Sequence, residues 1–532
     1  MKKRLCIILM AFVMAFVLIA PSVLAEDASL AAKYGFTSHI IGDGTQSITM
    51  LNYQNWNTSA YYDSPDGLLI ENLLEDITGV KVNWECVDFG DYETVAQTRL
   101  ASGMNLPDIL RLPVVTGVVT KYADEGLLLK MSDYINEDIT PNICKLFEKY
   151  PLIKAMATAP DGNIYALPYL EWDVNEVVVY WNSIRQDWLD NLGLSMPTTI
   201  DEYHNVLLAF KEKDANGNGD PNDEIPLGYS TDQMFGLYGL KGAYGMPFGK
   251  DIWSVNEGKV QLDLVDPRIK DLLITLNQWY KEGLLYTEVD NSGMVDVISQ
   301  DLLGGQTMLA SDNLMSYNGY AYSANPNCNY VYTPLLSNEQ YPVEKPQLYK
   351  RSTGMWGYFA ATTDAKDPEL VMRWIDYVWA SEESKHLRYY GLEGVTYEMV
   401  DGKEKFLDSI TQTENGAIAE MRTLGAWPNF LGNESGDAFM AMYAGQYPEK
   451  ARDEFSPYFI DWVPVVLGTP EEDSILARYW TDLEIYVKES FVGFVTGTKS
   501  LDEFDSYVQT CYDMGLDKVL EVRQAWYDRS SN

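Results

Sequence analysis

Histidine is the scarcest functional residue in this chain of 532 residues. Only His39, His204 and His386 occur, and they lie too far apart to form the HxxxH or HExxH pairs of zinc enzymes. A Ser-His-Asp triad is disfavoured for the same reason. No Walker, GxGxxG or GxSxG motif is present. The commonest signatures of enzymatic chemistry are therefore missing.

Positive charge is the second shortage. Lys and Arg number 39 against 78 Asp and Glu, which gives a net charge of −39. The basic residues Lys2, Lys3 and Arg4 stand in what is predicted below to be a leader. Without these three positive charges, −39 becomes about −42. Such a chain repels nucleic acids and anionic membranes, so neither is an expected partner.

Long apolar runs are confined to the N-terminus. The basic start precedes an apolar run over 5–20, and Val23-Leu24-Ala25 before Glu26 is typical of a cleavage site. We predict a signal peptide over 1–25, although an uncleaved anchor remains an alternative. Cys6 precedes the apolar run, so no lipoprotein cysteine is apparent. The protein is expected to be exported, to a periplasm or the cell surface.

Cysteine is also sparse, because four remain after cleavage and none are closely spaced. Neither a zinc site nor a disulfide framework is indicated. Apolar residues make up 46% of the full sequence, which is ample for burial. The mature chain of about 507 residues (532 minus 25) is too long for one hydrophobic core. This size predicts two large lobes.

A loop with calcium-binding character is present at residues 214–224. Short oxygen-bearing side chains occur at every second position from Asp214 to Asp220, and Gly219 is sixth. Position twelve is Ile225 rather than the Glu of an EF-hand, so a helix–loop–helix sensor is not predicted. We expect a structural Ca²⁺ site, with a plain solvated turn as the alternative. The candidate ligands are Asp214, Asn216, Asn218, Asp220, Asp223 and Glu224.

Periodicity predicts an α/β architecture. Residues 46–53 and 80–87 are expected to be strands, with a helix between them that Gly79 ends. A second helix is expected over 91–102, followed by a strand that begins at 107–110. This alternation favours βαβ units and a largely parallel sheet.

Capping residues predict four later helices. Thr199 with Glu202, and Ser500 with Glu503, form capping boxes. Asp266-Pro267 and Asp367-Pro368 each pair a cap with a proline at the first helical position. Trp279 holds helical spacing with its apolar neighbours and is expected in the core.

Five segments in order resemble one family. Residues 71–83, 91–110, 163–219, 363–403 and 491–520 are similar to extracellular solute-binding proteins of family 1, the sugar-binding components of ABC importers. Within it, the chain resembles the large subgroup with a calcium loop. The resemblance implies a two-lobed, periplasmic-binding-protein-like α/β fold with hinge-crossing strands and a ligand cleft between the lobes.

The resemblance also implies the lobe boundaries. The crossing strands are expected near 167–178 and 352–360. Lobe one would hold 30–170 plus 358–400. Lobe two would hold 171–355 plus 401–532, including the calcium-like loop and the C-terminal helices.

The implied function is capture of a carbohydrate and its delivery to an ABC-importer permease, with no chemistry on the ligand and the protein a monomer. The 37 Tyr and 14 Trp favour an oligosaccharide, because sugar rings stack on aromatic faces. The resemblance, together with aromatic and acidic residues in loops, indicates these ligand contacts: Trp56, Asn57, Trp172, Asp173, Asp232, Trp253, Asp312, Trp356, Glu393 and Trp427.

Two alternatives remain open. A secreted, calcium-stabilised glycoside hydrolase would also be acidic and aromatic-rich, but it needs two carboxylates flanking the scissile bond. A glycan-binding or chemosensory protein without a transport role would share the fold and the cleft.

Overall fold

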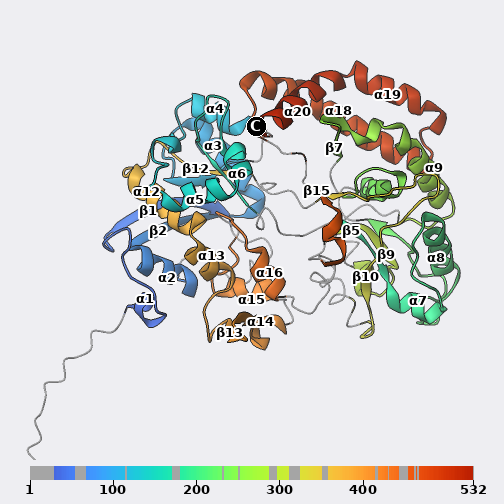
Figure 1. Ribbon diagram of the computed structural model, residues 1–532, viewed down its shortest axis with the longest axis horizontal. Helices are drawn as coiled ribbons and strands as arrows, with labels where there is room; N and C mark the ends of the chain where they lie inside the picture. Colours follow the sequence, from blue (N-terminus) through green and yellow to red (C-terminus); the bar gives the residue numbers. More distant parts are fainter. Residues whose placement is uncertain are drawn as a thin grey trace, which may run out of the picture.

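The computed structural model describes residues 29–53, 67–113, 117–170, 180–229, 233–249, 252–286, 296–310, 321, 324–349, 357–413, 417–428, 431–442, 453–460, 463 and 466–530. Two α/β lobes lie side by side, and the C-terminal helices run across one end of both (Figure 1). The predicted signal peptide lies outside the described residues. No helix in the described part is long and apolar enough to span a membrane.

Lobe one is built on a five-stranded sheet of order β2-β1-β3-β12-β4. β1 runs parallel to β2 and β3, whereas β12 is antiparallel to β3 and β4. Buried clusters cover both faces of the sheet, as expected for a largely parallel sheet. The strands are β1 (Gln46–Tyr53), β2 (Val80–Val87), β3 (Ile109–Arg111), β4 (Leu167–Pro168) and β12 (Tyr358–Ala361).

Helices and one hairpin complete lobe one. The early helices are α1 (Leu30–Lys33), α2 (Leu69–Thr78), α3 (Phe89–Ser102), α4 (Val118–Asp124), α5 (Pro141–Lys149) and α6 (Pro151–Ala157). The later helices are α12 (Pro368–Ile375), the π-helical η4 (Asp376–Ala380), α13 (Glu382–Tyr389), α14 (Asp408–Thr411), α15 (Ala417–Thr423) and α16 (Gly436–Met442). β13 (Tyr397–Val400) and β14 (Lys403–Phe406) pair as an antiparallel hairpin.

Lobe two is built on a four-stranded sheet of order β10-β5-β9-β6. β5 is antiparallel to β10 and β9, and β6 is parallel to β9. Its strands are β5 (Tyr180–Arg185), β6 (Gly228–Tyr229), β9 (Gly305–Ala310) and β10 (Tyr330–Tyr332), and β7 (Trp253–Asn256) pairs with β8 (Lys259–Leu262) in a hairpin. The main helices are α7 (Gln186–Leu192), α8 (Ile200–Glu212), the 3-10 helix η2 (Gln233–Tyr244), α9 (Pro267–Lys281), α18 (Pro470–Thr496), α19 (Phe504–Asp513) and α20 (Leu516–Ser530).

The local signals in the sequence account for these elements. Both predicted N-terminal strands form with the expected bounds, and Gly79 ends α2 in the left-handed conformation at φ 69°. Thr199 and Glu202 form the predicted capping box of α8. Trp279 of α9 is buried as expected.

Three connections join the lobes. The first follows β4, the second precedes β12 and the third follows α16. The first two meet lobe one side by side, because Tyr169 N donates to the Gly357 carbonyl at 3.0 Å. Leu170 N donates to the Gly432 carbonyl at 2.7 Å, so the segment leading to α16 lies there too. On the lobe-two side, β11 (Leu348–Tyr349) pairs with β15 (Phe459–Ile460). The first two connections and the segment leading to α16 therefore lie beside one another on the lobe-one side.

The expected division of the C-terminal part differs from the packing. The resemblance implies that residues 401–532 belong to lobe two, yet the buried side chains of 406–442 belong to the core of lobe one. Trp427, for example, lies 5.1 Å from Tyr389 of α13, measured between ring centroids. Only the part from 455 onward packs with lobe two. The chain therefore crosses between lobes three times.

The C-terminal helices also contact lobe one directly. The hydroxyl of Thr120 in α4 donates to Asp473 Oδ2 in α18 at 3.1 Å. Met156 of α6 is buried against Tyr349 of β11. Figure 1 shows α18 and α20 approaching α4 at one end of the molecule.

Candidate functional site

The edge of the lobe-one sheet that faces the connections carries a polar cluster. β1 and β3 are parallel and end at Tyr53 and Arg111, so both residues reach the same edge. Arg111 Nη1 donates to the Tyr53 hydroxyl at 2.8 Å, and Tyr92 donates its hydroxyl to the Arg111 carbonyl at 2.8 Å. Carboxyl ends of parallel strands are the usual position of ligand sites in open α/β sheets.

Two further polar contacts involve Glu434 and Arg422, whose charges act on Tyr53. Tyr169, next to the end of β4, donates its hydroxyl to Glu434 Oε1 at 3.2 Å. Arg422 Nε donates to the backbone carbonyl of Trp427 at 3.0 Å. Trp427 itself has φ 50° and Leu431 φ 45°, so the segment between α15 and α16 holds two bulky residues in the left-handed region. Such conformations persist only where surrounding contacts enforce them.

The lobe-two sheet presents a corresponding edge. β5 begins directly after the first connection, and β9 and β10 run antiparallel to it, so both end where β5 begins. β6 is parallel to β9 and ends there too. The described side chains at this edge are aromatic: Tyr229 ends β6, Tyr332 ends β10, and Tyr286 lies 6.4 Å from Tyr229 between ring centroids. The connections therefore bring the two sheet edges toward one region.

Most of the predicted ligand contacts lie outside the described residues. In sequence they directly follow the strand ends at these edges or occupy the connections. Asp232 comes three positions after β6 and Asp312 two positions after β9. The other residues outside the described part are Trp56, Asn57, Trp172, Asp173 and Trp356.

The remaining three predicted contacts have clear positions. Trp427 is buried in lobe one, where its indole Nε1 donates to the Tyr389 carbonyl at 2.8 Å. Trp253 is buried in lobe two, 4.9 Å from Trp480 between ring centroids. Both indoles are core side chains, so Trp253 and Trp427 are not proposed as ligand contacts. Glu393 is exposed in the turn before β13.

The predicted calcium loop curls through a series of side-chain to backbone contacts. Asp214 Oδ2 accepts from Gly219 N at 3.0 Å, Asn216 Oδ1 accepts from Asn218 N at 3.0 Å, and Asn218 Oδ1 accepts from Asp220 N at 2.8 Å. Gly219 has φ 97°, which its position in this turn requires. In the described part of the chain, no three His, Cys, Asp or Glu side chains are grouped to hold a metal ion. Two of the six candidate ligands, Asn216 and Asn218, are asparagines, whose oxygens are not included in such a group.

Two buried carboxylate oxygens in the loop lack a hydrogen-bond donor, namely Asp214 Oδ1 and Glu224 Oε2. Burial raises the pKa of Glu224, although its other oxygen accepts from Ala215 N at 2.7 Å. The amides of Asn216 and Asn218 point to Asp223, at 3.4 and 2.7 Å. Unsatisfied buried acceptors beside oxygen-bearing side chains fit a hard cation.

The loop is fastened to the start of the lobe-two strands. Ile225 N donates to the Leu302 carbonyl at 2.8 Å, and Gly304 N donates to the Ile225 carbonyl at 2.9 Å. β6 follows the loop and β9 follows residue 304, so the loop anchors both strands at the ends remote from the candidate ligand edge.

Sequence reasoning did not select Tyr53, Arg111, Tyr169 or Glu434. The available signal was position, because Tyr53 is the last residue of a predicted strand and Arg111 follows another apolar strand directly. The contact between Tyr169 and Glu434 spans 265 positions and has no local signal.

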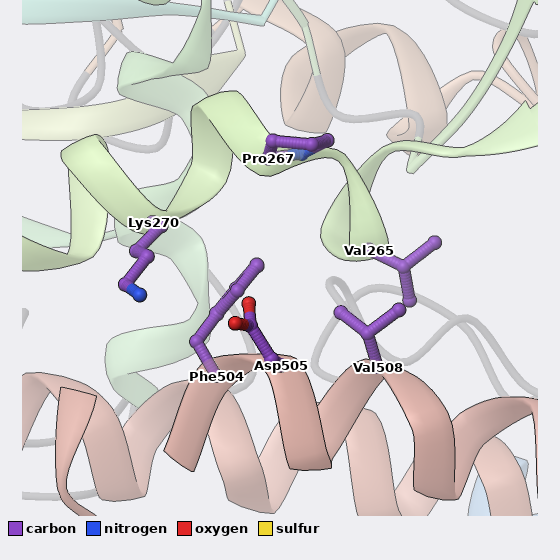
Figure 2. A pocket seen from close by; sticks show the side chains of 6 residues that line it. All are labelled: Val265, Pro267, Lys270, Phe504, Asp505 and Val508. Atoms are coloured by element: carbon purple, nitrogen blue, oxygen red, sulfur yellow. The ribbon is translucent and has the colours of Figure 1, made fainter. Parts of the chain in front are cut away.

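A small hollow also lies on lobe two, between the start of α9 and α19 (Figure 2). Its volume is about 210 Å³, below the roughly 300 Å³ at which ligand pockets begin. It contains none of the predicted site residues. Its lining is Val265, Pro267, Lys270, Phe504, Asp505 and Val508.

Comparison with known proteins decides the family. Residues 63–385, more than half of the chain, match the family described as bacterial extracellular solute-binding protein. The chain belongs to this family. Its members are exported, and the two-lobed α/β fold agrees with that assignment.

Two relatives with assigned ligands are similar to this chain over 66% or more of its length. The fructooligosaccharide ABC transporter substrate-binding protein FusA of Streptococcus pneumoniae is 27% identical over 499 residues, which cover 87% of each chain. The polygalacturonan/rhamnogalacturonan-binding protein YtcQ of Bacillus subtilis is 26% identical over 356 residues, which cover 66% of this chain and 67% of that protein.

Solved structures show the same fold. The alginate-binding protein AlgQ2 without calcium ion superimposes with a TM-score of 0.73 at 23% identity, covering 92% of this chain and 99% of that one. FusA in complex with kestose gives 0.71 at 23% identity, covering 91% and 99%. An EF-hand mutant of FusA with fructo-nystose gives 0.70 at 24% identity, with the same coverage.

Proposed function

We propose that this solute-binding protein captures an oligosaccharide between its lobes and delivers it to the permease of an ABC importer. The observation that carries the proposal is the convergence of two sheet edges on one hinged region. The family assignment and the likeness to FusA over 87% of both chains support it.

The residues suit sugar capture. The Arg111–Tyr53 and Tyr169–Glu434 contacts place polar groups at the lobe-one edge. Tyr229, Tyr286 and Tyr332 at the lobe-two edge are buried in its core, so we do not propose them as ligand contacts. Aromatic faces with a few placed polar groups are the usual composition of a sugar site. We propose Trp56, Asn57, Trp172, Asp173, Asp232, Asp312 and Trp356 as ligand contacts on their positions in the sequence, with Glu393 as a further candidate.

Transport requires that ligand binding favours the closed arrangement of the lobes. A ligand with equal affinity for the open and closed forms would shift nothing. Contacts from both edges to one sugar provide the required difference, because only the closed form makes both sets. The closed form, as a monomer, would then dock on the permease.

The test is a thermal-shift screen of residues 26–532 against mono- and oligosaccharides, followed by product analysis. A sugar present at 100 times its dissociation constant should stabilise the protein by about 2.7 kcal/mol. Recovery of that sugar unchanged supports a binding protein. Cleaved sugar would identify a hydrolase, and no shift with any sugar would contradict carbohydrate capture.

We also propose that Ca²⁺ occupies the loop over 214–224 in a structural role. Asp214, Asn216, Asn218, Asp220, Asp223 and Glu224 would hold it, and it would satisfy the two carboxylate oxygens that lack donors. The cation would also offset the repulsion among four carboxylates in one loop. Calorimetric titration of the metal-free protein with calcium tests this directly, and the absence of a binding isotherm up to 10 mM would contradict it.

A further inference from the structure

A buried carboxylate joins the C-terminal helices to lobe one. Asp473 lies in the first turn of α18 and is 9% exposed, and Thr120 of α4 is 8% exposed. The Thr120 hydroxyl donates to Asp473 Oδ2 at 3.1 Å. Because α18 packs in the core of lobe two and α4 in a core of lobe one, the two lobes share a hydrogen bond that is shielded from solvent.

Two glycines allow the backbone of each lobe to approach this carboxylate closely. A β-carbon added to Gly117, the residue before α4, would lie 2.9 Å from Asp473 Oδ2. A β-carbon added to Gly468, the residue before the cap of α18, would overlap Asp473 Oδ1. Gly117 also has φ 75°, a conformation that glycine adopts without strain. A side chain at either position would therefore push the carboxylate away from Thr120.

Apolar contacts extend the attachment between the lobes. Leu467, next to Gly468, packs against the buried cluster on one face of the lobe-one sheet. Met156 of α6 is buried against Tyr349 of β11, and Ile460 of β15 packs on this pair. α20 also lies beside α6. We call the contact formed by Gly117, Thr120, Leu467, Gly468 and Asp473 the α4–α18 joint.

The start of α18 is fixed to the rest of lobe two. Glu472 forms a capping box with Thr469, and its carboxylate accepts from both terminal nitrogens of Arg529 in α20, at 2.7 and 2.8 Å. The indole of Trp526 donates to Glu472 Oε2 at 3.2 Å. Because the start of α18 and the end of α20 hold each other, Asp473 moves together with lobe two.

The α4–α18 joint is an attachment between the lobes in addition to the connections. The first two connections and the segment leading to α16 meet lobe one side by side. One attachment of this kind would let the lobes twist as well as bend relative to each other. Figure 1 shows α18 and α4 meeting at one end of the molecule. Two bodies that are joined at two places can rotate only about the line through both places.

We propose that the α4–α18 joint stays closed while the lobes open and close, and that it thereby confines their motion to one rotation. This inference rests on the proposed function, because it specifies how the lobes enclose a ligand. A single axis brings the two sheet edges together in the same alignment at every closure. Thr120 and Asp473 act on ligand binding through this alignment, without contact to the ligand.

The test is a disulfide across the joint, made in residues 26–532. The β-carbons of the Gly117→Cys and Asp473→Cys variant would lie 3.2 Å apart, close to the roughly 3.5–4.5 Å of natural disulfides. Thr120→Cys with Asp473→Cys is a second pair, which places no cysteine at the left-handed position 117. Each single variant is a control for disulfides with the four native cysteines outside the signal peptide.

The first measurement needs no ligand. We expect complete cross-linking under oxidising conditions, read on a non-reducing gel. The oxidised and reduced forms should have the same radius of gyration in small-angle X-ray scattering, because the disulfide fixes a joint that is already closed.

The second measurement is calorimetric titration of both forms with kestose, the sugar in the FusA complex, and with every sugar that the thermal-shift screen identifies. We expect the dissociation constants of the oxidised and reduced forms to agree within about threefold. Saturation should lower the radius of gyration of both forms equally.

The results that would overturn the inference differ from those that would overturn the proposed function. A radius of gyration that changes on oxidation without ligand, or a sugar affinity that falls about tenfold or more, would show that the joint opens during the motion. Sugar binding by the reduced form would leave the proposed function intact in that case. Folded variants of both pairs that fail to cross-link would show that the joint does not form. If no sugar binds the reduced form or wild type, the proposed function fails, and the measurement without ligand still decides whether the joint stays closed.

Discussion

The two lobes hold their candidate ligand edges in different ways. In lobe one, the contacts that fix the edge lie at the edge itself, where Arg111 binds Tyr53 and Arg388 binds the carbonyl of Leu431. In lobe two, the strands are anchored at their opposite ends, by the loop over 214–224 and by Arg185 at the end of β5. The loop over 214–224 and a buried ion network therefore support the lobe-two strands from the ends remote from the candidate ligand edge.

The largest expected effect tests the anchor of lobe two. Arg185 is fully buried and pairs with Asp187 at 2.5 Å and Asp301 at 2.6 Å. Arg185→Met leaves both carboxylates without their cation and should lower the free energy of unfolding by about 3–5 kcal/mol. Chemical denaturation followed by tryptophan fluorescence measures the loss.

The control is a pair on the surface of lobe one. Arg373 pairs with Glu369 at 2.8 Å at exposed positions, so Arg373→Ala should cost less than about 1 kcal/mol. Similar losses for the two variants would contradict the role given to Arg185.

The second prediction tests the buried acid of lobe one. The pKa of Glu71 is raised to about 8 from 4.5 in the folded protein, so the folded state holds this proton more tightly than the unfolded chain. The stabilisation is full below pH 4.5 and is lost as pH rises through about 8. Glu71→Gln removes this loss. The variant should match wild type in its pH trend below about pH 4, diverge from it between about pH 4.5 and 8, and gain a few kcal/mol over it at pH 9, measured by urea denaturation. A constant difference across this range would contradict the assignment.

The third prediction tests whether the loop over 214–224 binds Ca²⁺, which an ordinary turn would not. At 10 mM Ca²⁺ and a dissociation constant of roughly 10⁻⁴–10⁻³ M, wild type should gain roughly 1.5–3 kcal/mol over the chelated protein. Asp214→Asn should abolish this gain. Asp161→Asn is the matched control, since the Asp161 carboxylate also accepts from a backbone N–H, that of Asn163 at 2.9 Å, and this variant should keep the full gain. Equal calcium responses of both variants would rule out the site.

The smallest expected effect concerns the contact between the lobes. Thr120→Val removes the donor to Asp473 Oδ2 and should lower the free energy of unfolding by about 1 kcal/mol. Thr98→Val is the control, because the Thr98 hydroxyl donates at an exposed position to the Thr94 carbonyl of its own helix. If Thr98→Val costs as much as Thr120→Val, the loss does not report a contact between lobes.

Much of the fold could be predicted because its signals are local. Alternation of apolar residues marked β1 and β2, and the capping residues around Thr199 and Asp266 marked α8 and α9. The position of residues 406–442 could not be predicted, because it depends on contacts such as Trp427 with Tyr389, which no sequence period encodes.

The candidate site was less predictable for a related reason. An indole in a polar loop gives the same signal whether it faces a ligand or the core, and Trp253 and Trp427 are core residues here. The Tyr53–Arg111 contact forms only once β1 and β3 pair. The calcium-like loop was visible because all of its candidate ligands are close in sequence.

The central claim is that one oligosaccharide is held by both lobes at once. Small-angle X-ray scattering of residues 26–532, with and without a saturating oligosaccharide identified by the screen, tests this claim most directly. We predict a smaller radius of gyration in the bound state, because contacts from both edges draw the lobes together about the hinge. An unchanged radius of gyration at demonstrated saturation would contradict capture between the lobes.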